Sequence, residues 1–82
     1  MTLTIALRKR IRELMKLNGI KSVNSLAKLS GVSNTLNGFM SNKIDLLQLD
    51  TILHICEGLD MQLYDFFKSP LFDDVLCEKP KK

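Results

Sequence analysis

The first proline in this 82-residue chain is Pro70, and before it four glycines, at positions 19, 31, 38 and 58, interrupt the apolar pattern. Proline and glycine are the strongest local breaks in secondary structure, so their spacing limits each element to the stretch between them. Within those stretches apolar residues recur every three or four positions, and the strict alternation typical of strands is absent. The first 69 residues are therefore predicted to form helices separated by glycine-containing turns.

The apolar spacing predicts five helices, several of them short. Ser22 and Ser33 are the predicted N-caps of the second and third helices, and Asn18-Gly19 and Ser30-Gly31 are the predicted stops of the first and second. The residues expected to face inward are Leu3, Leu7, Ile11, Leu14 and Met15 within residues 3–18; Val23, Leu26, Ala27 and Leu29; Leu36, Phe39 and Met40; Leu49, Ile52, Leu53, Cys56 and Leu59; and Leu63, Phe66 and Phe67, with Tyr64 also expected mostly in the core.

The composition, 45% apolar and 26% charged residues, is that of an ordinary globular domain. A domain this small commits nearly all its apolar residues to one core, which leaves little room for an enclosed active site. No apolar run approaches the roughly 18 residues of a membrane helix, and the N-terminus shows no small-residue cleavage site. A cytoplasmic protein is therefore expected.

Ser69-Pro70 is the predicted boundary between a compact domain, residues 1–69, and a C-terminal extension, residues 70–82. The extension carries too much apolar surface for a simple tail before it ends in charged residues. Two alternatives are open for this apolar surface: it pairs with a second copy to form a homodimer, or it packs back on the same domain. The residues concerned are Leu71, Phe72, Val75 and Leu76.

The net charge of +3 conceals an uneven distribution. Residues 1–28 carry +6, residues 29–78 carry −6 and residues 79–82 carry +3. In the basic third, Arg8, Arg12 and Lys16 form a stripe at four-residue spacing. A one-sided positive field is typical of proteins that bind polyanions such as nucleic acid, although a solvated helix face is an equally good interpretation of charge alone.

Residues suited to catalysis or metal binding are sparse and poorly spaced. Cys56 and Cys77 form no metal-ligand or redox motif and are expected to be free thiols. His54 is the single histidine, and Asp73 and Asp74 are adjacent, so on a helix they diverge. The sequence thus predicts no enzyme, no metal site and no cofactor.

The most informative feature is the run Leu26-Ala27-x-x-x-Gly31-Val32-Ser33, which joins two short predicted helices. A steeply crossing helix pair with a short turn needs a small side chain where the backbones approach, which Ala27 supplies. It also needs a turn residue that is free to take a positive φ, which Gly31 supplies. Val32 is expected in the core. In such a motif the N-terminal residues of the second helix reach base edges in the DNA major groove.

This run resembles the Cro/CI-repressor-like (XRE) helix-turn-helix family, and the resemblance extends over residues 5–67. The other segments that carry it are Arg10-Ile11-Arg12-Glu13-Leu14, Thr35-Leu36-Asn37, Leu49–Cys56 and Phe66-Phe67. The resemblance implies an all-α, five-helix, lambda-repressor-like DNA-binding domain whose second and third helices form the helix-turn-helix. It further implies a sequence-specific, repressor-like transcriptional regulator of a prokaryote or phage, which binds double-stranded DNA with helix 3 in the major groove and needs no cofactor.

The chain departs from the family pattern in two places. The family commonly begins helix 2 with a Gln that bonds a DNA phosphate, and Val23-Asn24 stands there instead. Between Ser33 and Thr35-Leu36 there is one residue fewer than usual. A one-residue deletion in a helix rotates the residues on its N-terminal side by about 100° relative to those on its C-terminal side. The first turn of helix 3 must therefore be rebuilt if Leu36 is to face the core.

Base-reading side chains are expected on helix 3, which carries no Arg, Lys or Gln. Asn pairs with adenine and the Thr methyl contacts thymine, so readout weighted towards A·T pairs is expected. A glycine inside a helix costs about 1 kcal/mol relative to alanine, which indicates either a close approach of DNA or of another helix, or simple tolerance. The candidates are Ser33, Asn34, Thr35, Asn37, Gly38 and Ser41.

Phosphate contacts are expected at the N-terminus of helix 2 and just after helix 3, because free N–H groups and lysines attract anions there. The candidates are Lys21, Ser22, Asn24, Lys28 and Lys43, with Arg10 less well placed. Each lysine has an alternative as a solvated charge. The acidic middle of the chain and the uncharged helix 3 favour an alternative function: a protein-interaction module on the same fold, such as an antirepressor or a toxin–antitoxin component.

Overall fold

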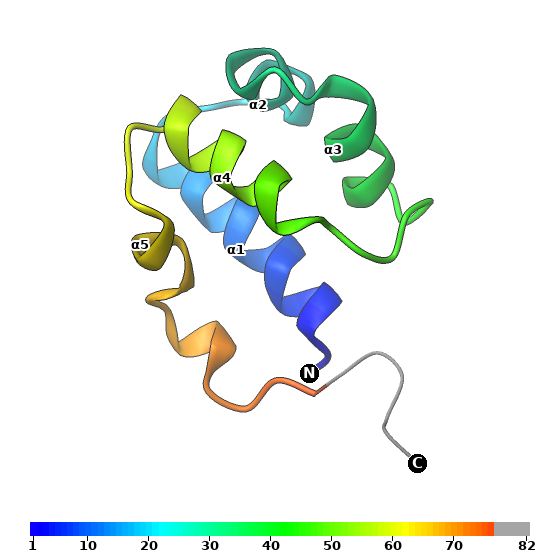
Figure 1. Ribbon diagram of the computed structural model, residues 1–82, viewed down its shortest axis with the longest axis vertical. Coiled ribbons are helices and arrows are strands. Elements are labelled where there is room, and N and C mark those ends of the chain that lie inside the picture. The colour runs from blue at the N-terminus through cyan, green and yellow to red at the C-terminus, as the bar shows by residue number, and fades with distance from the viewer. Residues whose placement is uncertain (77–82) are drawn as a thin grey trace.

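The computed structural model describes residues 1–76, except for the side chain of Ser33. It is all-α over these residues, as the sequence predicts, and contains five α-helices and one 3₁₀ turn. In Figure 1, α2 and α3 lie on one side of the molecule and α5 on the other, with α1 between them. The elements are α1 (Leu3–Leu17), α2 (Val23–Ser30), α3 (Ser33–Met40), α4 (Leu49–Gly58), α5 (Leu63–Phe67) and η1 (Pro70–Phe72).

One apolar core joins all five helices. Helices α2 and α4 approach each other closely, since a Cβ added at Gly58 would lie 3.1 Å from the carbonyl oxygen of Leu29. Ala27, the small residue predicted for the crossing of the second and third helices, is fully buried. The buried core residues are Leu7, Ile11, Leu14, Met15, Leu26, Ala27, Leu36, Phe39, Met40, Ile52, Ile55, Cys56 and Phe66.

The ends of α2 match the sequence prediction. The Ser22 side chain caps the helix by accepting a hydrogen bond from the N–H of Ser25 at 3.1 Å. Gly31 ends it with φ +73°, a left-handed conformation in which a side chain is strained. The left-handed turn predicted after α2 is thus confirmed.

The predicted cap of α3 is wrong. Ser33 is the first helical residue, and Val32 occupies the N-cap position with no side-chain hydrogen bond. The physical reason is burial of Leu36, which has 0% exposure and donates its N–H to the carbonyl of Val32 at 3.0 Å. The helix begins one residue earlier than predicted, which lets Leu36 reach the core.

The apolar faces of α1, α2 and α4 are narrower than predicted. In α4 the buried side centres on Ile52, Ile55 and Cys56, whereas Leu49 and Leu53 are 60% and 43% exposed. A ten-residue helix buries only one stripe of side chains against its neighbours. In α4 this stripe includes Thr51 and excludes Leu49 and Leu53. Three further residues predicted to be inside are also exposed: Leu3, Leu29 and Tyr64.

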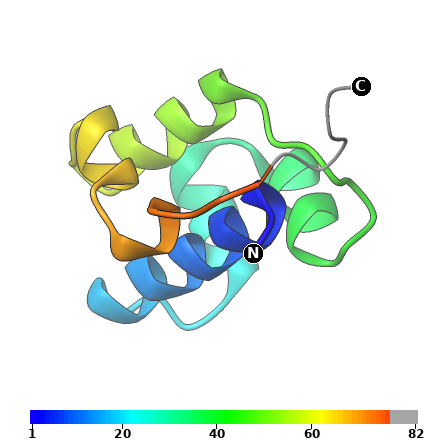
Figure 2. The same ribbon diagram turned by 90° about the horizontal axis from the view of Figure 1, so that it is seen from below.

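The segment after α5 returns to α1. Phe72 of η1 packs against Phe67, with 5.2 Å between ring centroids. Leu76 forms a parallel bridge with the start of α1: the Leu3 N–H donates to the Leu76 carbonyl at 2.8 Å, and the Leu76 N–H donates to the Met1 carbonyl at 3.0 Å. Figure 2 shows this stretch running beside the first turn of α1. Of the two alternatives, packing on the same domain is therefore present over residues 70–76.

Over the part of the chain that is described, no helix combines the length and apolar character needed to cross a membrane.

Candidate nucleic-acid interface

Helices α2 and α3 are joined by a tight turn that buries its apolar residues and leaves one face open. The turn is closed by the N–H of Val32, which donates to the carbonyl of Ala27 at 3.1 Å. Nothing lies within 4 Å of the position that a Cβ on Gly31 would take, so only the positive φ requires glycine there. This is the geometry of a helix-turn-helix.

Helix α3 has one buried and one polar face. Leu36, Phe39 and Met40 are buried, as predicted. The other face carries the base-reading candidates at helical spacing: Asn34 and Ser41 are exposed, Asn37 and Gly38 are half-buried, and Thr35, also half-buried, lies to one side. The Ser33 side chain lies outside the described part of the structure.

Gly38 makes room for the loop that comes after α3. A Cβ at this position would lie 2.7 Å from Cδ1 of Ile44. The carbonyl of Gly38 accepts hydrogen bonds from the N–H groups of Lys43 (2.9 Å) and Ile44 (3.1 Å). The segment that approaches Gly38 in the structure is its own loop and not another helix, whereas an approach of DNA stays a prediction.

The N-terminus of α2 and the polar face of α3 border the same depression. It is shallow, has a volume of about 300 Å³ and is lined by Val23 of α2 and by Asn37, Met40 and Ser41 of α3. Val23 thus borders the depression together with α3, and its neighbour Asn24 is exposed. Of the base-reading candidates, Asn37 and Ser41 therefore line the depression beside the first residue of α2.

The lysines predicted to contact phosphate are available. Lys21, Lys28 and Lys43 are all exposed, and none forms an ion pair with a carboxylate among residues 1–76. Lys43 comes directly after Asn42, whose φ of +68° turns the chain sharply after α3. The hydroxyl of Ser22 donates to Ser25 Oγ at 2.9 Å as well as capping α2, so it is already engaged.

Arg8, part of the predicted basic stripe, binds the end of α3. Its Nε donates to the carbonyl of Phe39 at 2.8 Å, and its Nη2 donates to the carbonyl of Ile44 at 3.1 Å. The guanidinium carbon lies 4.7 Å from the centroid of the Phe39 ring. Sequence reasoning missed this role, because the acceptors are backbone carbonyls that any sequence would provide.

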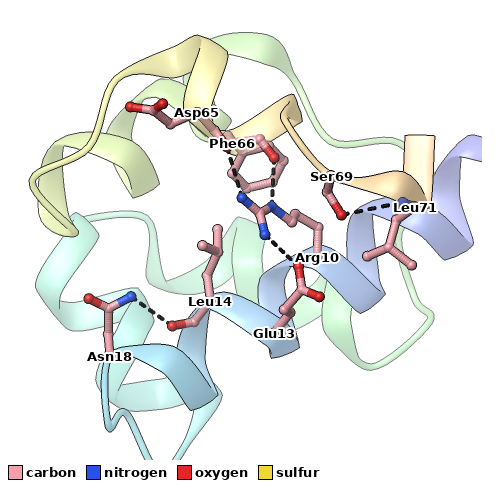
Figure 3. A network of polar contacts seen from close by, with 8 residues as sticks. All are labelled: Arg10, Glu13, Leu14, Asn18, Asp65, Phe66, Ser69 and Leu71. Atoms are coloured by element: carbon pink, nitrogen blue, oxygen red, sulfur yellow. Dashed lines mark hydrogen bonds and ion pairs between the residues drawn. The ribbon is translucent and has the colours of Figure 1, made fainter. Parts of the chain in front are cut away.

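Arg10 is held still more firmly (Figure 3). Its Nε donates to the carbonyl of Phe66 at 2.7 Å and its Nη2 to that of Asp65 at 2.8 Å, and Nη1 pairs with Glu13. With a side chain only 10% exposed, Arg10 caps the C-terminal end of α5 and is not positioned for DNA. On α1, the exposed basic side chains are Lys9, Arg12 and Lys16.

Residues suited to other chemistry are dispersed. Among residues 1–76 there is no group of three His, Cys, Asp or Glu side chains that could hold a metal ion. Burial raises the pKa of the Cys56 thiol, with the charge of Asp65 adding to the shift, so the thiol is neutral in the core. His54 is exposed, and its Nδ1 lies 3.5 Å from Oε1 of Glu57. Cys77 lies outside the described residues.

The dimerisation candidates of the C-terminal extension divide into two sets. Leu71, Phe72 and Val75 are half-buried, whereas Leu76 is 66% exposed. Only Leu76 therefore presents most of its side chain to the outside of this domain.

Comparison with known proteins agrees with this geometry. The family model of the Cro/C1-type HTH DNA-binding domain matches residues 10–70. No curated protein and no solved structure gives a significant match.

Proposed function

Because the chain belongs to the Cro/C1-type helix-turn-helix DNA-binding domains, we propose that it is a repressor-like transcriptional regulator of a prokaryote or phage, acting in the cytoplasm. It binds operator DNA with α3 in the major groove and with the N-terminus of α2 against the phosphate backbone. The observation that carries the proposal is the shared depression, which puts the start of α2 and the polar side of α3 on one face.

The side chains on that face suit two kinds of contact. Lys21 and Lys43 are exposed cations at the two ends of the helix pair and supply sequence-independent attraction to phosphates. Asn34, Asn37 and Ser41 lie between them along the chain and supply hydrogen bonds to base edges. Asn pairs bidentately with adenine, so we propose an operator rich in A·T pairs at the contacted positions.

A second candidate function keeps the fold and omits DNA. The polar face of α3 contains no cation among its described side chains, which weakens attraction to phosphate and favours a protein-interaction module such as an antirepressor or a toxin–antitoxin component. An interface of that kind responds little to salt, whereas DNA binding weakens by about 0.9 log units per log unit of salt for each phosphate neutralised.

The deciding experiment is selection from a randomised duplex pool at low and at physiological salt, with anisotropy titration of the enriched sequences. An enriched A·T-containing motif whose affinity falls steeply with salt supports the regulator. Absence of binding at both salt concentrations contradicts it and favours the protein-interaction module.

A further inference from the structure

The depression between α2 and α3 has an apolar side and a polar side. Val23, the first residue of α2, is half-buried there, and Met40, the last residue of α3, is 7% exposed. Asn37 and Ser41 line the polar side. Two hydrocarbon-rich side chains from different helices therefore lie next to an amide and a hydroxyl at the surface of the molecule.

The apolar side of the depression suits a small apolar group. Removing apolar surface from water is favourable, and neither side chain can donate a hydrogen bond to a phosphate or a base. The flexible thioether of Met40 adapts its shape to what it contacts. A small-molecule site encloses most of its ligand, which a shallow depression does not, so the apolar group must belong to a larger molecule.

Double-stranded DNA presents one methyl group in its major groove, the C5-methyl of thymine. The same A·T pair presents N7 and N6 of adenine, which an Asn side chain binds with two hydrogen bonds. Asn37 lines the depression together with the two apolar residues, whereas the Ser41 hydroxyl donates to the carbonyl of Gly38 at 3.3 Å. The lining therefore offers an amide for adenine beside an apolar surface for thymine.

We infer that Val23 and Met40 contact the C5-methyl group of a thymine beside the adenine that Asn37 binds. The inference rests on the proposed function and deepens it, because it makes Val23 of α2 a specificity-determining residue outside the helix that enters the groove. Thr35, the side chain of α3 that also carries a methyl group, is not part of the lining.

Single replacements of thymine by deoxyuridine in the selected operator test the inference, because uracil keeps the base pairing and lacks only the methyl group. Anisotropy titration of the full chain measures the affinity for each duplex. Burial of one methyl group corresponds to about a fourfold change in affinity, so one thymine next to the preferred adenine should show a loss of this size. The thymines elsewhere in the same duplex are the internal control and should show little change.

The variant Val23→Ala should lower the ratio of affinities for the thymine and uracil duplexes from about four towards one. Val75→Ala is the matched control, because this valine is also half-buried but follows η1, and the ratio should persist. A merely structural loss in α2 weakens binding to both duplexes equally and leaves the ratio unchanged. Val23→Thr keeps the shape of the side chain and gives the same comparison if urea unfolding shows that the alanine variant is poorly folded.

Three outcomes contradict the inference. Equal affinity for the thymine and uracil duplexes at every position overturns it and leaves the proposed function intact. A ratio that Thr35→Ser abolishes and Val23→Ala preserves also overturns it, because the methyl group then contacts Thr35. Absence of DNA binding overturns the proposed function, and the inference with it.

Discussion

Helix α1 carries four basic residues between Arg8 and Arg12, whereas α3 carries none. The depression is nevertheless lined by polar side chains of α3 and by no basic side chain of α1. Arg8 and Arg10 donate hydrogen bonds to backbone carbonyls at the ends of α3 and α5. The contrast teaches that in so small a domain basic side chains also serve as helix caps. Charge density along the sequence therefore does not by itself identify which basic side chains are free to contact a partner.

The largest effect is expected from Arg10→Ala, which tests whether an arginine of α1 serves as a helix cap. It removes the hydrogen bonds to the Asp65 and Phe66 carbonyls, of which Asp65 keeps the Lys68 N–H as a donor and Phe66 loses its donor. It also leaves the Glu13 carboxylate without its partner, so the free energy of unfolding should fall by about 3 kcal/mol. Urea unfolding measures the loss. The control is Arg12→Ala on the exposed side of α1, for which a change within about 0.5 kcal/mol is expected; comparable losses from both would show that Arg10 is not a structural cap.

Arg8→Ala should cost less, about 2 kcal/mol, because its side chain is only half-buried and its two carbonyl bonds lie nearer to solvent. We also expect weaker DNA binding with an unchanged salt slope, since Arg8 positions the end of α3 without touching phosphate. Unfolding and anisotropy titrations at several salt concentrations measure these effects, with Lys9→Ala as the exposed neighbour. If Arg8→Ala reduced the salt slope, this side chain would contact a DNA phosphate, and the assignment of Arg8 as a helix cap would be wrong.

Asn37→Ala should change which sequence is preferred and leave folding nearly unaltered. Losing a bidentate contact to adenine reduces discrimination at one base pair by about 1–3 kcal/mol. The measurement is a competition titration against operators that differ at single positions. Equal loss of affinity on every duplex would show that Asn37 does not read bases.

The smallest effect is expected from Lys43→Ala, with Lys21→Ala as a parallel case. Removing one phosphate contact should weaken binding to all sequences and reduce the salt slope by about 0.9. Lys68→Ala, an exposed lysine at the end of α5, is the control and should leave the slope unchanged. An identical response to Lys43→Ala and Lys68→Ala would remove Lys43 from the interface.

The sequence predicts correctly those structural features that depend on residues close together in the chain. The Ser22 cap, the left-handed Gly31 and the inward side of α3 each depend on neighbours within a few residues, and all three are confirmed. The predicted start of α3 is wrong because the N-cap is selected by burial of Leu36 in a core that distant segments build. The prediction for Tyr64 is wrong for the same kind of reason, since nothing in α5 alone shows which side meets α1.

By itself, then, the sequence determined an all-α domain with a helix-turn-helix at α2 and α3, because apolar periodicity and turn residues are properties of contiguous chain. Only the tertiary structure decided the use of Arg8 and Arg10 and the partner of Gly38. The arginine contacts join residues far apart along the chain, 31 positions for Arg8 and Phe39 and 56 for Arg10 and Phe66. Such contacts exist only once the helices have packed, and no local pattern encodes them.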